Sequence, residues 1–383
     1  MGYITRAVPS LCSALLITVL AAGTMPAWAQ SDRDEFVTGR AAEAWEIWQR
    51  GMTAVLAQDT AAAEEAFGAL LATEPSPLRV ALLEERTVRR TASGGAILLL
   101  EQDLRQEQER RKADPGFRLE KLGDNARAVL QLLAAGRAQR ERANDGWYFA
   151  SIGRFDVSQA NFEALLADEP DPVALLEFAD RERTRHEILL QLTGDPVMGP
   201  VVEELLALLR EGERIVKADP IRVRRNIERL GGPPRAFENA VALLKDSGEY
   251  AVPFIIEALG DPDRRALTPA LIRCLPQIDR PALNPLVVAL ETTDDAVRLH
   301  AIRALGEIGY RQAVPYLLLR QSQATTPEES AALATALTAI ASRAGDVDLS
   351  QAPAVAFFQL AEQYYDDNPA LAADTRLATA NVW

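Results

Sequence analysis

The residues with side chains suited to catalysis or metal binding are few and lie far apart in this sequence. The two histidines are His186 and His300, and neither has a second histidine or a cysteine at the spacing of a metal ligand. A zinc site of the ordinary kind needs three or four nitrogen, sulfur or oxygen ligands. We therefore predict that the chain has no metal site.

The sequence motifs of common enzymes are also missing. The chain contains no Gly-x-Ser-x-Gly turn of a serine hydrolase. It contains neither the glycine-rich phosphate loop that ends in Lys-Ser/Thr nor the Gly-x-Gly-x-x-Gly dinucleotide turn. Carboxylates are abundant, but on amphipathic helices they normally form the solvent face. We predict no catalytic residues, no cofactor and no enzymatic activity.

The first 29 residues have the pattern of a secretory signal peptide. Arg6 precedes an apolar run at Leu11–Ala22, and Ala27 and Ala29 form a small-x-small cleavage site that leaves Gln30 as the new N-terminus. The run is short for a membrane span. We expect export to the periplasm or the extracellular space, without stable membrane insertion after cleavage. An uncleaved membrane anchor is the alternative.

The mature chain would keep a single cysteine, Cys274, so it can form no disulfide within itself. Cys274 lies on the small-residue face of an expected helix, which favours a buried apolar side chain over a reactive or intermolecular thiol. His300 is expected to be partly buried in a helix. His186 lies near Arg181 and Arg185 and is expected on a solvated helix.

Composition and charge narrow the class of protein. Of 383 residues 48% are apolar and only 6% aromatic, and no alternating strand-like runs stand out, which favours packed helices. The net charge of −14 becomes −15 when Arg6 is removed with the leader. An acidic surface argues against nucleic acid as a partner, since phosphates attract a basic surface. It also argues against adhesion to anionic lipid.

A helical hairpin is predicted at Asp294–Leu318. Asp294 or Asp295 can cap the first helix, Gly309 suits the left-handed residue that ends it, and Pro315 suits the first turn of the next helix. The apolar face of the first helix is formed by Val297, Ala301, Ala304, Leu305 and Ile308. Such a hairpin buries its face only when copies stack on either side.

Copies of this hairpin occur along the C-terminal half. Their openings contain Pro253, Pro285 and Pro315, which are 32 and 30 residues apart. The pattern resembles the short HEAT-like repeats of phycobilisome-lyase relatives, and the resemblance spans roughly Val201–Arg343. It implies that Asp294 and Arg298 brace neighbouring repeats and that small residues let the helices approach closely. The copy at Asp261–Leu275 departs from the pattern, with leucine in place of Arg298.

A second repeat occupies the N-terminal half. The residues of the two copies are Gly51, Ala63, Phe67 and Pro75, and then Gly146, Phe149, Gly153, Phe162 and Pro170. The closing segments Phe67–Pro75 and Phe162–Pro170 align directly, 95 residues apart. This pattern resembles a tetratricopeptide repeat. The resemblance implies a close helix crossing at the small residues, an aromatic ring that fills the crossing, and a proline after the second helix.

We therefore predict an all-α, helical-hairpin solenoid in which tetratricopeptide-like repeats are followed by HEAT-like repeats. The expected regions are the signal peptide at 1–29, a tetratricopeptide-like region at 30–193, a HEAT-like solenoid at 194–345, and a C-terminal helix and tail at 346–383. The expected helices include Arg40–Ala57, Thr60–Ala72, Leu78–Arg90, Ala96–Lys112, one or two helices in Leu119–Arg142, Pro172–Leu192, Val201–Lys217, Pro220–Leu230, Pro234–Leu244 and Ala354–Tyr365. The charge run Glu101–Lys112 is interpreted as a solvated helix, with a docking surface as the alternative.

These patterns lead to a functional hypothesis by analogy of fold. Solenoids present long grooves that hold other proteins or extended peptides. We expect a non-enzymatic exported scaffold or adaptor with a protein or peptide partner; the residues that bind it and the oligomeric state are not predicted. The alternative is the regulatory front part of a larger exported enzyme. A lyase acting on a tetrapyrrole-bearing protein rests on the repeat resemblance alone, and export and the scarcity of His and Cys count against it.

Overall fold

The structure is a computed structural model that describes residues 39–90, 94–345, 347–366, 368 and 371. These residues all belong to one unit by contact. Within them the regular structure is entirely helical, which confirms the predicted all-α solenoid. The predicted cleavage site at Ala27, Ala29 and Gln30 lies outside the described residues, as does most of the segment after Tyr365.

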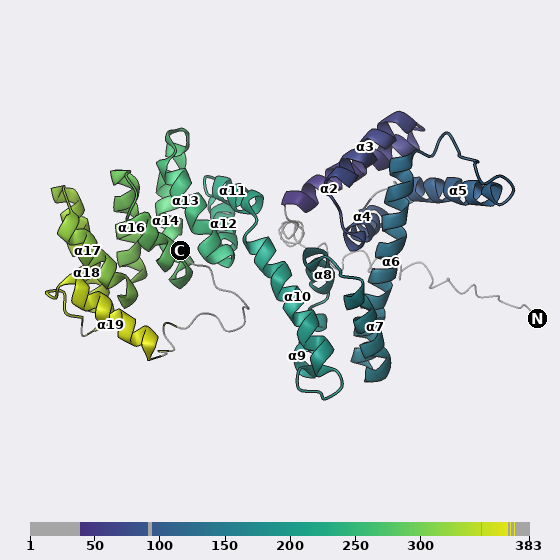
Figure 1. Cartoon of the computed structure of the whole chain (residues 1–383). Coiled ribbons are helices and arrows are strands. Elements are labelled where there is room, and N and C mark those ends of the chain that lie inside the picture. The colour runs from purple at the N-terminus through teal and green to yellow at the C-terminus, as the bar shows by residue number, and fades with distance from the viewer. Residues whose placement is uncertain (1–38, 91–93, 346, 367, 369–370, 372–383) are drawn as a thin grey trace, which may run out of the picture. The chain divides into compact units, whose positions relative to one another are not determined.

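The N-terminal half is built from antiparallel helical pairs (Figure 1). Its helices are α2 (Gly39–Leu56), α3 (Thr60–Ala72), α4 (Pro77–Arg90), α5 (Gly94–Arg111), α6 (Asp124–Ser151), α7 (Phe155–Ala167), α8 (Pro172–Ala179), α9 (Arg183–Leu192) and α10 (Gly199–Lys217). The pairs α2–α3 and α6–α7 are the two predicted repeat hairpins, and α4 packs along α6.

Both hairpins cross in the same way. A Cβ atom on Gly51 would lie 2.7 Å from the Phe67 ring, and one on Gly146 would lie 2.4 Å from the Phe162 ring. Both rings are fully buried. The glycines are thus needed for the close approach that the aromatic ring fills. The buried Ser158 side chain is accommodated at the second crossing because its Oγ donates a 2.8 Å hydrogen bond to the Gly146 carbonyl oxygen.

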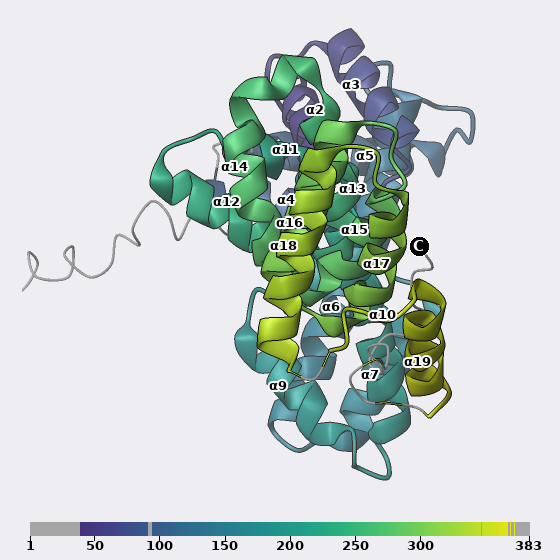
Figure 2. The ribbon, with the colours of Figure 1, turned by 90° about the vertical axis from the view of Figure 1, so that its left-hand side faces the viewer.

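The C-terminal half repeats one motif. Its helices are α11 (Pro220–Arg229), α12 (Pro234–Ser247), α13 (Ala251–Gly260), α14 (Thr268–Cys274), α15 (Leu283–Ala289), α16 (Asp295–Ile308), α17 (Val314–Gln323), α18 (Pro327–Ala344) and α19 (Pro353–Tyr365). A short 3₁₀ turn precedes each of α13, α15 and α17, the three openings predicted from the prolines. A continuous apolar core runs through this half from Val223 to Ala356. Figure 2 shows α19 beside α17, against which it packs.

The helix ends of the organising hairpin follow local rules. Asp294 is the N-cap of α16, and its Oδ1 accepts hydrogen bonds from the amides of Ala296 and Val297. Gly309 ends the helix at φ 81°, in the left-handed region that favours glycine. Pro315 lies in the first turn of α17, where its missing N–H breaks no helical hydrogen bond.

Two predictions about the helices need correction or sharpening. The segment Pro172–Leu192 is two helices, because α8 ends at Ala179 and α9 starts at Arg183. The buried Arg185 folds back to donate a 2.7 Å hydrogen bond to the Phe178 carbonyl oxygen near the end of α8. The segment expected to hold one or two helices is one long helix, α6. Helix α10 packs mainly against α8. The change from tetratricopeptide-like to HEAT-like repeats near residue 194 stays a prediction.

The mixed charge run on α5 is only partly solvated. An i,i+4 ion pair joins Glu101 to the exposed Arg105 at 3.5 Å. Glu107, however, is 2% exposed and accepts hydrogen bonds from the Leu119 amide at 2.9 Å and from Arg127 at 2.7 Å. These bonds lower the pKa of Glu107, with the Arg127 hydrogen bond as the largest cause. Glu107 therefore ties α5 to α6 and to the loop between them.

Candidate functional site

The N-terminal ends of helices α4, α8 and α11 lie near α2 and have the same local sequence pattern. Helices α4, α8 and α11 each begin with a proline, and the residue before it accepts a hydrogen bond from a backbone amide of the first turn. These bonds are Arg79 N to Ser76 Oγ at 3.2 Å, Val173 N to Asp171 Oδ1 at 3.0 Å and Ile221 N to Asp219 Oδ1 at 2.8 Å. The same local sequence signal thus forms three equivalent ends.

Side-chain hydrogen bonds join these ends in two pairs. Ser76 Oγ donates to Asp171 Oδ2 at 3.1 Å, which joins α4 to α8. The Gly39 amide, at the start of α2, donates to Asp219 Oδ2 at 2.7 Å, which joins α2 to α11. A Cβ atom on Gly39 would lie 2.4 Å from the Ile221 side chain, so the contact is close. The N-terminal and C-terminal halves are therefore joined directly at this point.

A groove of about 830 Å³ lies among these helix starts. We call it the junction groove; it is formed by α2, the α3–α4 loop, the start of α8 and the α10–α11 turn. Its apolar lining comes from Ala41, Ala44, Pro172, Val173, Ile215 and Ile221. The last two side chains are 37% and 48% exposed. A concave surface with exposed aliphatic side chains is suited to taking up apolar side chains of a partner.

Two arginines that line the junction groove, Arg79 and Arg214, have carboxylate partners. Arg79 is buried, pairs with Glu177, and lies 3.9 Å from Asp171. Arg214 donates two hydrogen bonds to the Glu211 carboxylate, at 2.8 and 2.6 Å, and these bonds raise the pKa of Arg214. Because these side chains already have partners, the groove can receive a ligand without first ordering its rim.

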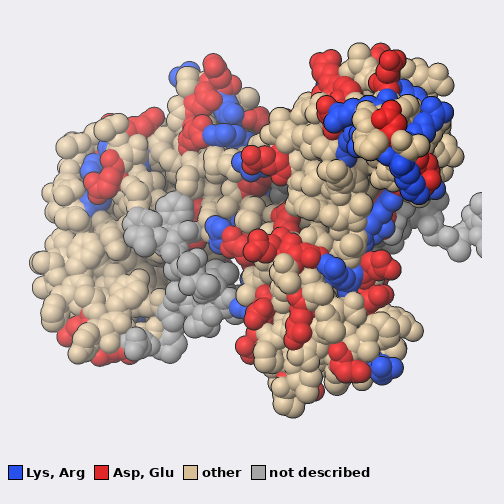
Figure 3. Space-filling view, turned by 45° about the vertical axis from the view of Figure 1, so that its right-hand side comes forward, with Lys and Arg blue, Asp and Glu red and all other residues tan. Residues whose placement is uncertain are grey.

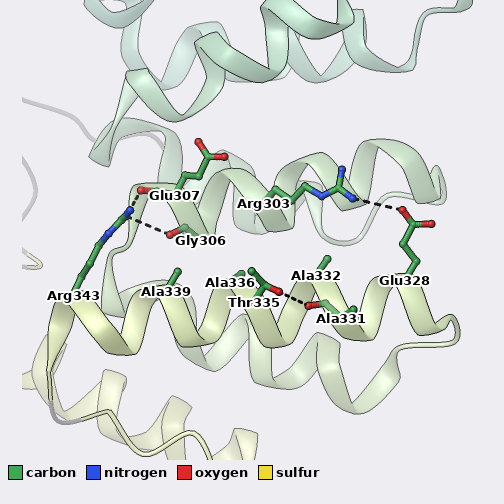
Figure 4. A pocket seen from close by; sticks show the side chains of 10 residues that line it. All are labelled: Arg303, Gly306, Glu307, Glu328, Ala331, Ala332, Thr335, Ala336, Ala339 and Arg343. Carbon is green, nitrogen blue, oxygen red and sulfur yellow. Dashed lines mark hydrogen bonds and ion pairs between the residues drawn. The ribbon is translucent and has the colours of Figure 1, made fainter.

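A second, smaller groove of about 390 Å³ lies between α16 and α18 (Figure 4). Its floor is a row of alanines on α18, and a Cβ atom on Gly306 would lie 2.7 Å from the Ala336 Cα, so the two helices touch. Arg303 and Glu328 form an ion pair of 3.5 Å at one end. At the other end Arg343 donates to the carbonyl oxygens of Gly306 and Glu307.

Two buried arginines, Arg298 and Arg222, and the half-buried Arg320 brace neighbouring segments of the chain. Arg298 donates to Glu329 of the next repeat at 2.9 Å and to the Thr292 carbonyl oxygen, which is the bracing that the repeat resemblance implied for it. Arg320 reaches the same carboxylate at 2.6 Å. Arg222, near the start of α11, likewise donates a hydrogen bond to the carbonyl oxygen of the earlier residue Val216 at 3.3 Å. In both helices, α16 and α11, an arginine near the N-terminal end is therefore bonded to the segment that precedes the helix.

The residues that the sequence singled out for chemistry, Cys274, His300 and His186, lie in three different helices, α14, α16 and α9. Cys274 is buried, and burial raises the pKa of its thiol to about 12. Burial, with Arg303 as a second cause, lowers the pKa of His300. His186 is partly buried, with Nδ1 3.6 Å from Asp180 Oδ1. Over the part of the chain that the structure describes, no three His, Cys, Asp or Glu residues are grouped as metal ligands would be.

The repeats of the C-terminal half can now be compared with known proteins. Residues 252–341 match the family of HEAT repeats. This range runs from α13 through most of α18 and includes the Arg298–Glu329 brace. The comparison with curated proteins finds no match to this chain. No helix in the described ranges is both long enough and apolar enough to span a membrane.

Sequence reasoning did not locate the junction groove. The signal that points to it is the repeated pair of a capping residue and a proline at Ser76-Pro77, Asp171-Pro172 and Asp219-Pro220. Each pair predicts a helix start, but nothing in the linear sequence says that the three starts lie together. That proximity depends on contacts such as Gly39 to Asp219, between residues 180 positions apart.

Proposed function

We propose that this chain is a non-enzymatic, exported scaffold that binds a segment of another protein in the junction groove. The observation that carries the proposal is the apolar lining of the groove between helix starts that are joined in two pairs, α4 to α8 and α2 to α11. The HEAT-repeat match supports a protein as the partner, since such repeats form extended binding surfaces. The signal-peptide pattern at 1–29 supports export.

The lining of the groove favours an extended peptide segment over a globular surface. It comes from four structural elements, and three of them contribute the apolar residues named above: Ala41 and Ala44 on α2, Pro172 and Val173 at the start of α8, and Ile215 and Ile221 at the α10–α11 turn. An extended segment with apolar residues at alternate positions can place side chains toward such a lining while its other side chains face solvent.

The proposal can be tested by selecting binders from a displayed library of random peptides. The chain is used as bait beside the variants Ile215→Glu and Ile221→Glu, which place a carboxylate in the groove. Leu190→Glu is the matched control, since Leu190 is 62% exposed on α9 and does not line the groove. Apolar peptides that bind the wild type and the control and lose at least about tenfold in affinity for both groove variants would support the proposal. Peptides that bind all four chains equally would overturn it.

The alternative hypothesis is that the chain is a regulatory part of a larger exported enzyme. It requires a catalytic domain encoded in frame after the codon for Trp383 or in an adjacent gene. The genomic sequence downstream of this codon distinguishes the two hypotheses. A scaffold that acts alone requires no such neighbour.

A further inference from the structure

Helix α19 is attached to the solenoid by one face only. Ala356 and Leu360 are buried against α17, and the Phe357 ring meets the Tyr316 ring edge to face, with centroids 4.9 Å apart. These contacts fix the orientation of α19. They leave the opposite face of the helix without a packing partner among the described residues.

That opposite face carries three large apolar side chains in register. Val355, Phe358 and Tyr365 are 47%, 63% and 89% exposed. Their spacing of three and then seven residues places them on one side of a helix. The exposed Glu362 fills the remaining position of this row, so that the four residues follow the 3-4-3 spacing of a helix–helix seam. We call this row the α19 seam.

All the charged residues in the segment that carries the α19 seam are acidic. The stretch from Gly345 to Asp366 contains four acidic residues and no lysine or arginine. Among these acids Asp348, Glu362 and Asp366 are exposed. Figure 3 shows acidic atoms along the lower edge of the end that carries α17 to α19, and acidic and basic atoms side by side higher on the same end. A partner with positive charge would therefore be attracted to this helix.

We propose that the α19 seam packs against a basic amphipathic helix of a protein partner. Aliphatic side chains of the partner would cover Val355 and Phe358, and a lysine or arginine would face Glu362. That cation is needed because a carboxylate shielded from water in a packed seam is costly unless it is paired. The exposed aromatic rings also suit a cation, and this chain already places arginine over phenylalanine, with Arg273 over Phe237 at 4.1 Å and Arg224 over Phe254 at 4.9 Å.

A second copy of the same helix is a poorer occupant. In a parallel pair Glu362 would face its own copy, which brings like charges together and disfavours association. In an antiparallel pair Glu362 would face the N-terminal turns of the other helix, Pro353–Phe358, which contain no cation to pair with it. The inference does not depend on the junction groove either, because none of the residues that line the groove belongs to α19.

The test uses the full chain and two synthetic helical probes, each about three heptads long. One probe has leucine on one face and lysine on the other, and the second has glutamate in place of every lysine. Binding is measured by fluorescence anisotropy at two salt concentrations. The chain variants are Phe358→Ala, Tyr365→Ala and Glu362→Lys, with Tyr148→Ala and Glu65→Lys as controls. Tyr148 is 59% exposed on α6, and Glu65 is exposed on α3, both far from α19 in sequence.

We expect the lysine probe to bind the wild type and both controls. Phe358→Ala and Tyr365→Ala should each weaken this binding by about tenfold or more, since aromatic residues at the centre of an interface contribute most of the affinity. Glu362→Lys should abolish binding of the lysine probe and create binding of the glutamate probe. Equal binding of the lysine probe to the wild type, Phe358→Ala and Glu362→Lys would mean general attraction to an acidic protein and would overturn the proposal. Self-association of the wild type that Phe358→Ala abolishes, without probe binding, would also overturn it in favour of a second copy.

Discussion

Ser76 Oγ donates a 3.1 Å hydrogen bond to Asp171 Oδ2, and these two residues occupy the same position in the two copies of the N-terminal repeat. Their separation of 95 residues equals the offset between the repeats. Each is also the cap of the helix that follows its repeat. Equivalent residues of the two repeats are thus in direct contact, and both of them line the junction groove.

This contact predicts energetic coupling between the two caps. Asp171→Ala should lower the free energy of unfolding by about 1–2 kcal/mol, because it removes the cap of α8 as well as the acceptor for Ser76. Ser76→Ala should cost about 1 kcal/mol. The double variant should show a coupling energy of at least about 0.5 kcal/mol in urea denaturation.

Asp59→Ala is the control for this cycle. Asp59 caps only α3, through the Ala62 amide at 3.0 Å. Its effect should add to that of Ser76→Ala with no coupling. Additive effects for both pairs would show that the Ser76–Asp171 bond does not contribute to stability.

The close packing of α4 on α6 predicts that adding one methyl group at Gly136 destabilises the fold. A Cβ atom on Gly136 would lie 1.8 Å from the Pro77 carbonyl oxygen, so Gly136→Ala must push the two helices apart. We expect a loss of about 1–3 kcal/mol in stability from this overpacking. Gly95→Ala should have the opposite sign, because its new Cβ would lie 4.0 Å from the nearest side chain and alanine favours a helix by up to about 1 kcal/mol. Thermal unfolding followed by circular dichroism measures both changes.

The Arg298–Glu329 brace predicts loss of stability in acid. The pKa of Glu329 is lowered, mainly because Arg320 donates a hydrogen bond to it and Arg298 donates another. The folded state therefore binds a proton at this site less readily than the unfolded state. The stabilisation is fully present above the ordinary pKa of 4.5 and is lost as the pH falls through the lowered folded-state value.

Removing this carboxylate tests the same brace. Glu329 is 2% exposed, so Glu329→Gln leaves two arginines without their shared anion, and we expect a loss of about 3 kcal/mol at neutral pH. The variant should also lose the part of the acid dependence that belongs to this site. The exposed neighbour Glu328 provides the control, since Glu328→Gln should change stability by less than about 0.5 kcal/mol. An equal effect of both variants would contradict the brace.

The burial of Cys274 predicts a thiol that does not react in the folded protein. Burial raises its pKa to about 12, so the thiolate is scarce at neutral pH and the sulfur is shielded from reagents. A maleimide reagent should label the folded chain without its first 29 residues at the rate of unfolding, and should label it at once in denaturant. Rapid labelling of the folded protein would show an accessible thiol.

The signal-peptide hypothesis predicts a defined mature end. When the full chain is expressed in a bacterium with an export pathway, the N-terminal residue of the exported product should be Gln30. Ala29→Arg should block this cleavage, because the cleavage site requires a small residue there. N-terminal sequencing of the product checks both expectations, and retention of residues 1–29 in the wild type would favour an uncleaved anchor.

The sequence by itself determined the helical hairpins and their repetition. Asp294 and Gly309 set the ends of α16, because an N-cap and a left-handed C-terminal residue act on the backbone within a few positions. The pairs Gly51–Phe67 and Gly146–Phe162 could be read from spacing, since both partners of each crossing lie in one short hairpin. Local interactions of this kind recur wherever the same residues recur.

Only the tertiary structure decided which charges are buried and where a groove forms. Glu107 lies in a run that reads as a solvated face, yet it is buried because α6 brings Arg127 against it. The junction groove exists because Gly39 meets Asp219 across 180 residues of chain. The composition of a segment does not predict this contact, because the distance between Gly39 and Asp219 depends on the packing angles of all the helices between them.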